Sequence, residues 1–397
     1  MKKKILVGLS ALALVLSMPF IPSAVSADDA SPENISINQT NFPDEKFRDY
    51  VKKFDQDSNG ILSDTEIAAV TSINVSGEGV SNLNGIGYFT SLTVLNCYKN
   101  QLTSLDVENN TMLEKLYCFE NQLTSLNVGK NTKLKLLNCH SNQLTSLDVR
   151  DNTLLEKLVC YKNQLTSLDV SQNTALKELG CYSNRLTSLD VRNNTLLQML
   201  YCYSNRLTSL DVRNNTLLEN LYCYSNQLGS LDVSQNTALT NLSCTQNPLT
   251  SLDLSKTSVS KLNADQTNKE YAYRAVIREG KFDLSTLSGF DVSKASDWTN
   301  VQLDGNIITV TDFSEPVTYK YDTGKGIASF MMIATLAGDA NLDGKVDVRD
   351  CAYIARMLAA GKGNELPDSA DFNDDGKTDV RDAAAIARFL AKNHKNN

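Results

Sequence analysis

The chain has 397 residues and is acidic, with 38 lysine and arginine residues, 46 aspartate and glutamate residues and a formal net charge of −8. This charge disfavours nucleic acid as a partner and suits divalent cations. The two histidines, His140 and His394, are too few for a multi-histidine metal centre and leave little for a serine–histidine triad. We therefore expect a protein without catalytic activity, with room for two or three domains.

Residues 1–27 have the features of a cleaved secretory signal peptide. Three lysines precede an apolar run at 5–16, and the small residue Ala27 ends the segment. Removing those lysines leaves 35 basic against 46 acidic residues, a net charge of about −11. The remaining sequence contains no second hydrophobic span, so we expect a secreted, extracellular protein that reaches a cell surface only through a partner.

Residues 28–72 are predicted to form an EF-hand-like N-terminal cap. The segment 55–66, DQDSNGILSDTE, has the residue types of a calcium loop at every ligand position and lies between two helical segments. The predicted ligands are side-chain oxygens of Asp55, Asp57, Asn59 and Glu66 and the carbonyl oxygen of Ile61. The alternative is a folded hand that holds no calcium and only caps the following domain.

Residues 73–263 contain a 21-residue repeat of the form L-x-x-L-x-C-x-x-N-x-L-x-x-L-D-V-x-x-N-T-x. In each half-unit, apolar and polar residues alternate over a short strand before an asparagine-containing corner. A single unit cannot bury its leucines, so the units are expected to stack into a solenoid. The pattern resembles leucine-rich repeats, which implies parallel strands, and the units have no helix-length segment.

Eight cysteines recur at the same spacing of 21 residues. They are Cys97, Cys118, Cys139, Cys160, Cys181, Cys202, Cys223 and Cys244. Stacked coils would hold neighbouring Cβ atoms about 4.8 Å apart with parallel bonds, whereas a disulfide favours about 3.8 Å. A straight column also cannot surround a metal tetrahedrally. We predict reduced, buried cysteines, with occasional disulfides as the alternative.

An aromatic column follows the cysteines and is predicted to lie on the concave face of the solenoid. Its members are Tyr98, Phe119, His140, Tyr161, Tyr182, Tyr203 and Tyr224. The rings can stack into a ladder that stabilises the sheet, or they can bind a protein or a glycan. A separate aspartate column, from Asp106 to Asp253, is predicted to be structural, with nearby threonine and serine hydroxyls as its hydrogen-bond donors.

Residues 264–337 change in composition to short strands and turns. This predicts a small all-β domain. The order and spacing of its strands resemble the immunoglobulin-like modules that follow leucine-rich repeats in secreted bacterial proteins such as internalins.

Residues 338–397 contain two further calcium loops, DANLDGKVDVRD at 339–350 and DFNDDGKTDVRD at 371–382. Each loop is followed, but not preceded, by a helical segment, and its carboxylates would repel one another without a cation. The predicted ligands are Asp339, Asn341, Asp343, Asp347 and Asp350 with the carbonyl of Lys345, and Asp371, Asn373, Asp375, Asp379 and Asp382 with the carbonyl of Lys377.

The duplicated loop-then-helix arrangement resembles the type I dockerin modules of cellulosomal proteins from anaerobic bacteria. The resemblance implies two bound calcium ions and a cohesin module of a scaffold protein as the partner. The recognition positions carried over from the family are Val348, Arg349 and Arg356 in the first half and Val380, Arg381 and Arg388 in the second. Because the two halves are nearly identical, the module could dock in either of two orientations.

Taken together, the sequence predicts a multidomain, mainly β, non-catalytic protein of the cellulosome. It would attach to a scaffold cohesin through a calcium-dependent dockerin and present its solenoid to another protein. The alternatives are a carbohydrate-binding accessory subunit that uses the tyrosine column and an internalin-like adhesin. We expect two calcium ions in the dockerin and a third in the N-terminal hand.

Overall fold

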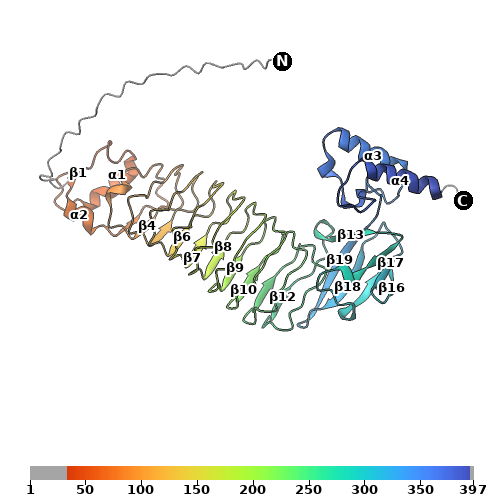
Figure 1. Cartoon of the computed structure of the whole chain (residues 1–397). Helices are drawn as coiled ribbons and strands as arrows, with labels where there is room; N and C mark the ends of the chain where they lie inside the picture. The colour runs from red at the N-terminus through yellow and green to blue at the C-terminus, as the bar shows by residue number, and fades with distance from the viewer. Residues whose placement is uncertain (1–33, 394–397) are drawn as a thin grey trace, which may run out of the picture.

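The computed structural model describes residues 34–393 and shows a helical region, a long stack of coils, a β region and a second helical region in chain order (Figure 1). The predicted signal peptide at 1–27 lies outside the described residues, as do 28–33 and 394–397. Among the helices of the described part, none has the length and apolar character needed to cross a membrane.

The N-terminal region closes one end of the stack of coils. Its elements are β1 (Ile35–Ser36), α1 (Glu45–Val51), η1 (Lys52–Phe54), β2 (Ile61–Leu62) and α2 (Asp64–Ala69). The Asp44 side chain caps α1 by accepting a hydrogen bond from the Phe47 N–H at 3.0 Å. Phe42 and Phe47 are fully buried and belong to the same core cluster as the coils, so this region covers the leucines of the first coil.

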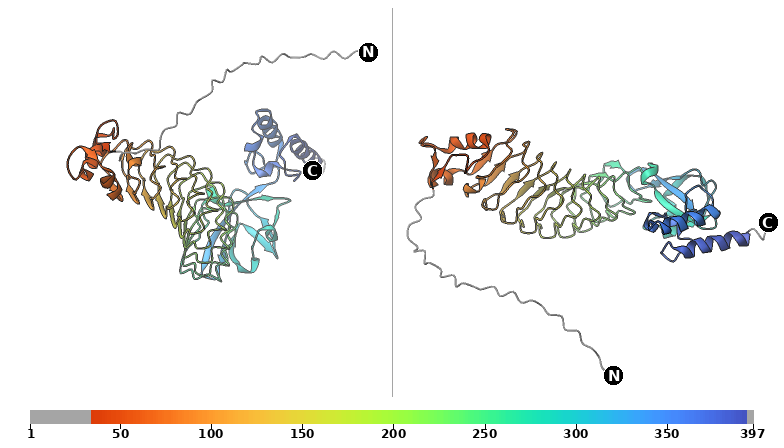
Figure 2. Two further views of the ribbon diagram at one scale, coloured as in Figure 1. Left: turned by 60° about the vertical axis from the view of Figure 1, so that its left-hand side comes forward. Right: turned by 90° about the horizontal axis from the view of Figure 1, so that it is seen from above.

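The coils form a ten-stranded parallel sheet that confirms the predicted leucine-rich-repeat solenoid (Figures 1 and 2). The strands are β3 (Ser72–Asn74), β4 (Val94–Asn96), β5 (Lys115–Tyr117), β6 (Leu136–Asn138), β7 (Lys157–Val159), β8 (Glu178–Gly180), β9 (Met199–Tyr201), β10 (Asn220–Tyr222), β11 (Asn241–Ser243) and β12 (Lys261–Asn263). A short η2 (Ile86–Tyr88) follows β3. Leucines pair in register across the sheet, as Leu158 does with Leu179, and both are fully buried.

One column of asparagines, at the corner after each strand, ties neighbouring coils together. Asn163 is typical: its Nδ2 donates to the carbonyl oxygens of Cys139 at 3.1 Å and Cys160 at 3.0 Å, and its Oδ1 accepts from the Leu144 N–H at 3.0 Å. A single side chain therefore bonds to buried backbone groups of two coils, and each of the two carbonyls also accepts from the asparagine of a neighbouring coil.

A second asparagine column lies at the corner of the other half-unit. Asn173 Nδ2 donates to the carbonyl oxygens of Val149 at 2.8 Å and Asn152 at 2.9 Å. Its Oδ1 has no hydrogen-bond partner among the described residues, unlike that of Asn163. The two columns thus differ in the number of backbone groups that each side chain satisfies.

The cysteine column is buried and reduced. The eight repeat cysteines are free thiols with 0% exposure, as predicted, and Cys351 is a half-buried free thiol. Burial raises the pKa of Cys139 and of Cys181 to about 12. Such thiols stay protonated and pack as small apolar groups.

The aspartate column is satisfied in a different way from the prediction. Asp148 Oδ1 accepts from the backbone N–H of Arg150 at 3.1 Å, and the Arg150 guanidinium lies 2.7 Å from Asp148 Oδ2. Asp169 likewise accepts from the Ser171 N–H at 2.9 Å. The donors are thus the residue two positions later, as in an Asx-turn, and not the preceding threonine and serine hydroxyls.

The β region is a sandwich of two sheets, ordered β13-β19-β18-β15 and β14-β17-β16. Its elements are η3 (Lys269–Tyr271), β13 (Tyr273–Ile277), β14 (Lys281–Asp283), η4 (Leu284–Thr286), η5 (Val292–Lys294), β15 (Ala295–Thr299), β16 (Val301–Asp304), β17 (Ile307–Val310), β18 (Val317–Asp322) and β19 (Ile327–Leu336). The hydroxyl of the buried Tyr319 donates to the Thr250 carbonyl at 2.6 Å, which fastens the sandwich to the last coils.

The C-terminal region pairs α3 (Val348–Ala359) with α4 (Val380–Asn393), joined through η6 (Gly363–Glu365) and η7 (Asp368–Ala370). Its small core includes Ile354 and Ile386, which are both fully buried. Strand β19 runs into this region with almost no linker, because the Gly338 N–H already donates to the Ser369 carbonyl at 2.8 Å.

Candidate calcium sites and binding surfaces

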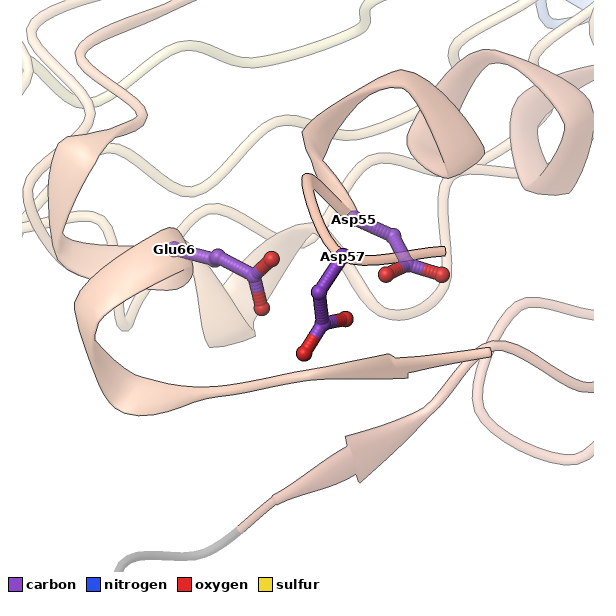
Figure 3. Close-up of side chains that lie close together, drawn as sticks. All are labelled: Asp55, Asp57 and Glu66. Atoms are coloured by element: carbon purple, nitrogen blue, oxygen red, sulfur yellow. The ribbon is translucent and has the colours of Figure 1, made fainter. Parts of the chain in front are cut away.

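Three carboxylates converge in the N-terminal hand (Figure 3). Asp55, Asp57 and Glu66 each offer an oxygen, and these oxygens lie within 4.8 Å of one another. Hydrogen bonds from the Ser63 backbone N–H and hydroxyl and from the Gln56 N–H lower the pKa of Glu66. Gathered, ionised carboxylates are the hard oxygen ligands that calcium prefers, so these residues fit the ion.

The other two predicted ligands lie in the same loop. Asn59 Oδ1 accepts from the Ile61 N–H at 2.7 Å, and Asn59 Nδ2 donates to Asp57 Oδ2 at 2.8 Å. Gly60 has a φ of +81°, and its N–H donates to Asp55 Oδ2 at 2.8 Å. Residues other than glycine rarely adopt this backbone conformation, which makes the sharp turn of the loop.

The first C-terminal loop orients its ligands through its own backbone. Asp339 Oδ1 and Oδ2 accept from the N–H groups of Asp343 at 3.0 Å and Gly344 at 2.8 Å. The fully buried Asp350 accepts from the Ala340 N–H at 2.9 Å. Burial raises the pKa of Asp339, and the nearby carboxylates of Asp350 and Asp343 add to the shift. A buried acid destabilised by its neighbours fits a cation ligand.

The second C-terminal loop repeats this arrangement. Asp371 Oδ2 accepts from the Gly376 N–H at 2.9 Å, and the fully buried Asp382 accepts from the Asn373 N–H at 3.1 Å and the Asp379 N–H at 2.9 Å. The remaining predicted ligands, Asn341, Lys345, Asp347, Asp375 and Lys377, lie in the same two loops. Calcium bound there would neutralise the acidic clusters and hold each loop against the start of its helix.

Two of the predicted cohesin-recognition arginines contact these ligands. Arg349 Nη2 lies 2.6 Å from Asp347 Oδ2 and 3.1 Å from Asp343 Oδ2, and these interactions lower the pKa of Asp347. From the sequence, Arg349 is assigned to partner recognition, and this contact is not foreseen. The sequence did contain a signal for this contact. In the Asp-x-Arg segment the aspartate is the helix N-cap, and the arginine two residues later lies next to it.

The other predicted recognition residues are exposed on the helices. Val348 and Val380 are 71% and 67% exposed, the two highest values among the exposed large apolar side chains of the described residues. Arg356 lies over the Tyr353 ring, and Arg388 donates through Nε to the carbonyl of its own helix at Ala384.

A residue of the β region also reaches the second loop. Arg278 donates to the carbonyl oxygens of Phe372 at 3.0 Å and Asp371 at 3.2 Å, and it lies 2.9 Å from Asp374 Oδ1. At the corresponding position of the first loop stands Leu342, which is half exposed. The two halves of the module are therefore inequivalent in the whole chain.

The seven aromatic residues predicted for the concave face form one continuous stack, which we call the ring ladder. Neighbouring ring centroids lie 4.1 to 4.4 Å apart, with interplanar angles of 6° to 20°. Each interior ring therefore has both faces covered by neighbours and presents only its edge to solvent. A second pair, Tyr201 and Tyr222, lies on the adjacent strands with centroids 5.3 Å apart.

The buried imidazole in this ladder gives a pH prediction. His140 is 8% exposed and lies between Phe119 and Tyr161. Burial lowers its pKa, while Glu120 raises the pKa and Lys162 lowers it by smaller amounts. The unfolded chain therefore binds the proton first, and stability is lost as the pH falls below about 6.5. Urea unfolding measures the free energy of unfolding at about pH 7.5 and at about pH 5.5. This free energy should fall less between the two pH values in His140→Tyr, which keeps the stack, than in the unsubstituted protein. An equal loss in both proteins would contradict this.

The chain was compared with known protein families, with known proteins and with solved structures. Residues 337–391 match the family model of the dockerin type I domain. A segment of 71 residues is 42% identical to internalin J of Listeria monocytogenes serotype 4b strain F2365, and it covers 18% of this chain but 8% of that protein. The chain thus spans a small part of the length of this relative.

Two solved internalin structures are among those to which the chain is similar. The functional domain of internalin J from Listeria monocytogenes, described as including a cysteine ladder, is 23% identical, with a TM-score of 0.36 over 77% of this chain and 99% of that one. An internalin of Listeria monocytogenes strain F2365 is 22% identical, with a TM-score of 0.48 over 59% and 78%.

The chain is therefore a leucine-rich-repeat solenoid protein. It carries a dockerin type I domain at its C-terminal end.

Proposed function

We propose that the chain is a secreted, non-catalytic binding protein that attaches to a cohesin module of a scaffold protein and presents its solenoid to a further protein. The observation that carries the first part is the pair of loops in the dockerin type I domain, each with a buried closing aspartate and an exposed valine at the start of its helix. Exposed apolar residues beside charged ones are typical of protein interfaces. In the family, such a scaffold belongs to an extracellular cellulosome.

Calcium dependence is part of this proposal. Two ions in the dockerin would offset the repulsion among its carboxylates, and a third in the N-terminal hand would offset that among Asp55, Asp57 and Glu66. The N-terminal ion would stabilise the cap, because the hand shares its core with the first coils. Attachment would then depend on the dockerin ions alone.

For the solenoid, the ring ladder supports a protein ligand better than a glycan. Sugar rings stack on the faces of aromatic side chains, and the interior faces of this ladder are already covered. What remains accessible is a row of tyrosine hydroxyl edges beside Tyr201 and Tyr222, and tyrosine hydroxyls are common hydrogen-bonding groups in protein interfaces.

A triple variant, Tyr182→Phe with Tyr203→Phe and Tyr224→Phe, tests this surface. Phe119 shows that the ladder accepts phenylalanine, so stacking should persist while three hydroxyls disappear. We expect an unchanged melting temperature and at least about tenfold weaker binding, since three interface hydrogen bonds at about 0.5–1.5 kcal/mol each are lost. The readout is the affinity for the protein that the full chain captures from culture proteins, measured by calorimetry.

The control is Tyr271→Phe, which removes a hydroxyl outside the ladder. Unchanged affinity in the triple variant would remove the ring ladder from the proposal. A glycan-array signal that the triple variant loses would instead favour the carbohydrate-binding accessory, and capture of a host-cell receptor would favour the internalin-like adhesin.

A further inference from the structure

Both dockerin loops hold an arginine against their own calcium ligands. In the first loop Arg349 bridges Asp343 and Asp347, and it also donates through Nε to both oxygens of Asp347, at 3.1 and 3.0 Å. In the second, Arg381 Nη2 lies 3.0 Å from Asp375 Oδ2 and 2.7 Å from Asp379 Oδ2. The same bidentate geometry occurs twice, at the fifth, ninth and eleventh loop positions.

The N-terminal hand is an internal comparison, because it has no such arginine. Its ninth and eleventh positions are Ser63 and Thr65. Its fifth position is Asn59, so the hand also lacks the pair of carboxylates that each arginine contacts in the dockerin loops. The three carboxylates that gather within 4.8 Å in the hand stand at positions one, three and twelve. The arginine and its two carboxylate partners therefore occur together in the dockerin loops and are absent together from the hand.

We propose that Arg349 and Arg381 are calcium-competing counter-cations, which weaken calcium binding in their own loops until a partner protein draws them onto its surface. A guanidinium stabilises the calcium-free loop by neutralising its carboxylates, and it repels a divalent cation bound nearby. Both effects lower calcium affinity, so removing the guanidinium raises it. A partner that binds the arginine has the same effect, and by linkage calcium then strengthens binding of the partner.

This inference goes beyond calcium dependence as such, because it makes attachment and calcium binding mutually reinforcing. A calcium ligand pair and a recognition residue share one ion-pair network in each half of the domain. The first step of the inference concerns the chain alone, and only the coupling to a partner rests on the proposed cohesin binding.

The test is calcium titration of the full chain by calorimetry, in a Glu66→Gln background that removes the N-terminal site. The double variant Arg349→Gln with Arg381→Gln should bind calcium about tenfold more tightly than the background protein. Arg349→Lys with Arg381→Lys keeps the charge and should gain much less. Circular dichroism confirms that each variant is folded.

The matched control is Arg356→Gln with Arg388→Gln, which makes the same charge change on the same helices without touching the loop carboxylates. Its calcium affinity should stay within about twofold of the background, because distant exposed charges are screened. Equal or weaker affinity in the Arg349/Arg381 variant, or an equal gain in the control, would overturn the proposal.

A second arm measures the coupling. Saturating type I cohesin should tighten calcium binding by both proteins, because the loops position the helices that bind it, but it should do so less in the Arg349/Arg381 glutamine variant, which has no guanidinium left to release. Equal tightening in both would overturn the coupling. If no cohesin binds at all, the proposed attachment fails, while the calcium titration of the chain alone still decides the counter-cation role.

Discussion

Replacing the two buried closing aspartates, by Asp350→Ala with Asp382→Ala, is expected to abolish calcium binding by the dockerin loops and to unfold that domain. Each carboxylate is fully buried and accepts hydrogen bonds from backbone N–H groups of its own loop. The variant loses a calcium ligand and leaves those buried donors unpaired, at about 1–3 kcal/mol each. The core of this domain is too small to absorb such a loss.

Calcium titration and circular dichroism of the full chain measure this effect. We expect calcium affinity of the dockerin sites to fall at least about 100-fold, because a ligand of each ion is removed, while the main thermal transition of the solenoid stays unchanged. Glu365→Gln is the control, since Glu365 is an exposed acid of the same domain whose ion pair within residues 34–393 is with Lys362. Retained calcium binding in the double variant would show that these loops are not the sites.

Asn163→Ala, which represents the first asparagine column, is expected to destabilise the solenoid by about 4 kcal/mol. Its loss leaves the N–H of Leu144 without a partner among the described residues. It also removes one of the two amide donors from each of the carbonyls of Cys139 and Cys160. Asn173→Ala removes two bonds to carbonyls that also accept from backbone N–H groups, and it should cost only about 1–3 kcal/mol. The two columns look alike in sequence, so the order of these values tests the structural difference between them.

Urea unfolding of the full chain gives these free energies, and hydrogen exchange locates the effect in the coils around each substitution. Ser167→Ala, at an exposed position of the same coil, should change stability by less than about 0.5 kcal/mol. Equal losses for the two asparagines would mean that the Leu144 contact contributes nothing.

The solenoid and the calcium loops were predictable because their information is local and periodic. A constant spacing of 21 residues places equivalent side chains above one another, so the repeat itself assigns Cys139 to the interior and Asn163 to a corner of its coil. The ligands of each calcium loop lie within twelve consecutive residues, and spacing alone identifies them.

The features that sequence reasoning missed depend on longer-range placement or on competition between donors. Arg278 meets the second loop across 93 or 94 residues of chain, with no motif to announce it. The donors of the aspartate column were misjudged for another reason. Asp169 accepts from the residue two positions later, and turn geometry favours that donor over the hydroxyls considered first. The contact of Arg349 with Asp347 has the same two-residue spacing and was not considered.

The most direct test of the account is calorimetric titration of a panel of type I cohesins into the full chain, with millimolar calcium and again after chelation. The account predicts one-to-one binding to at least one cohesin in calcium and at least about 100-fold weaker binding after chelation, since the loops that position both helices need the ion. Binding to no cohesin in calcium, or equal binding after chelation, would contradict it.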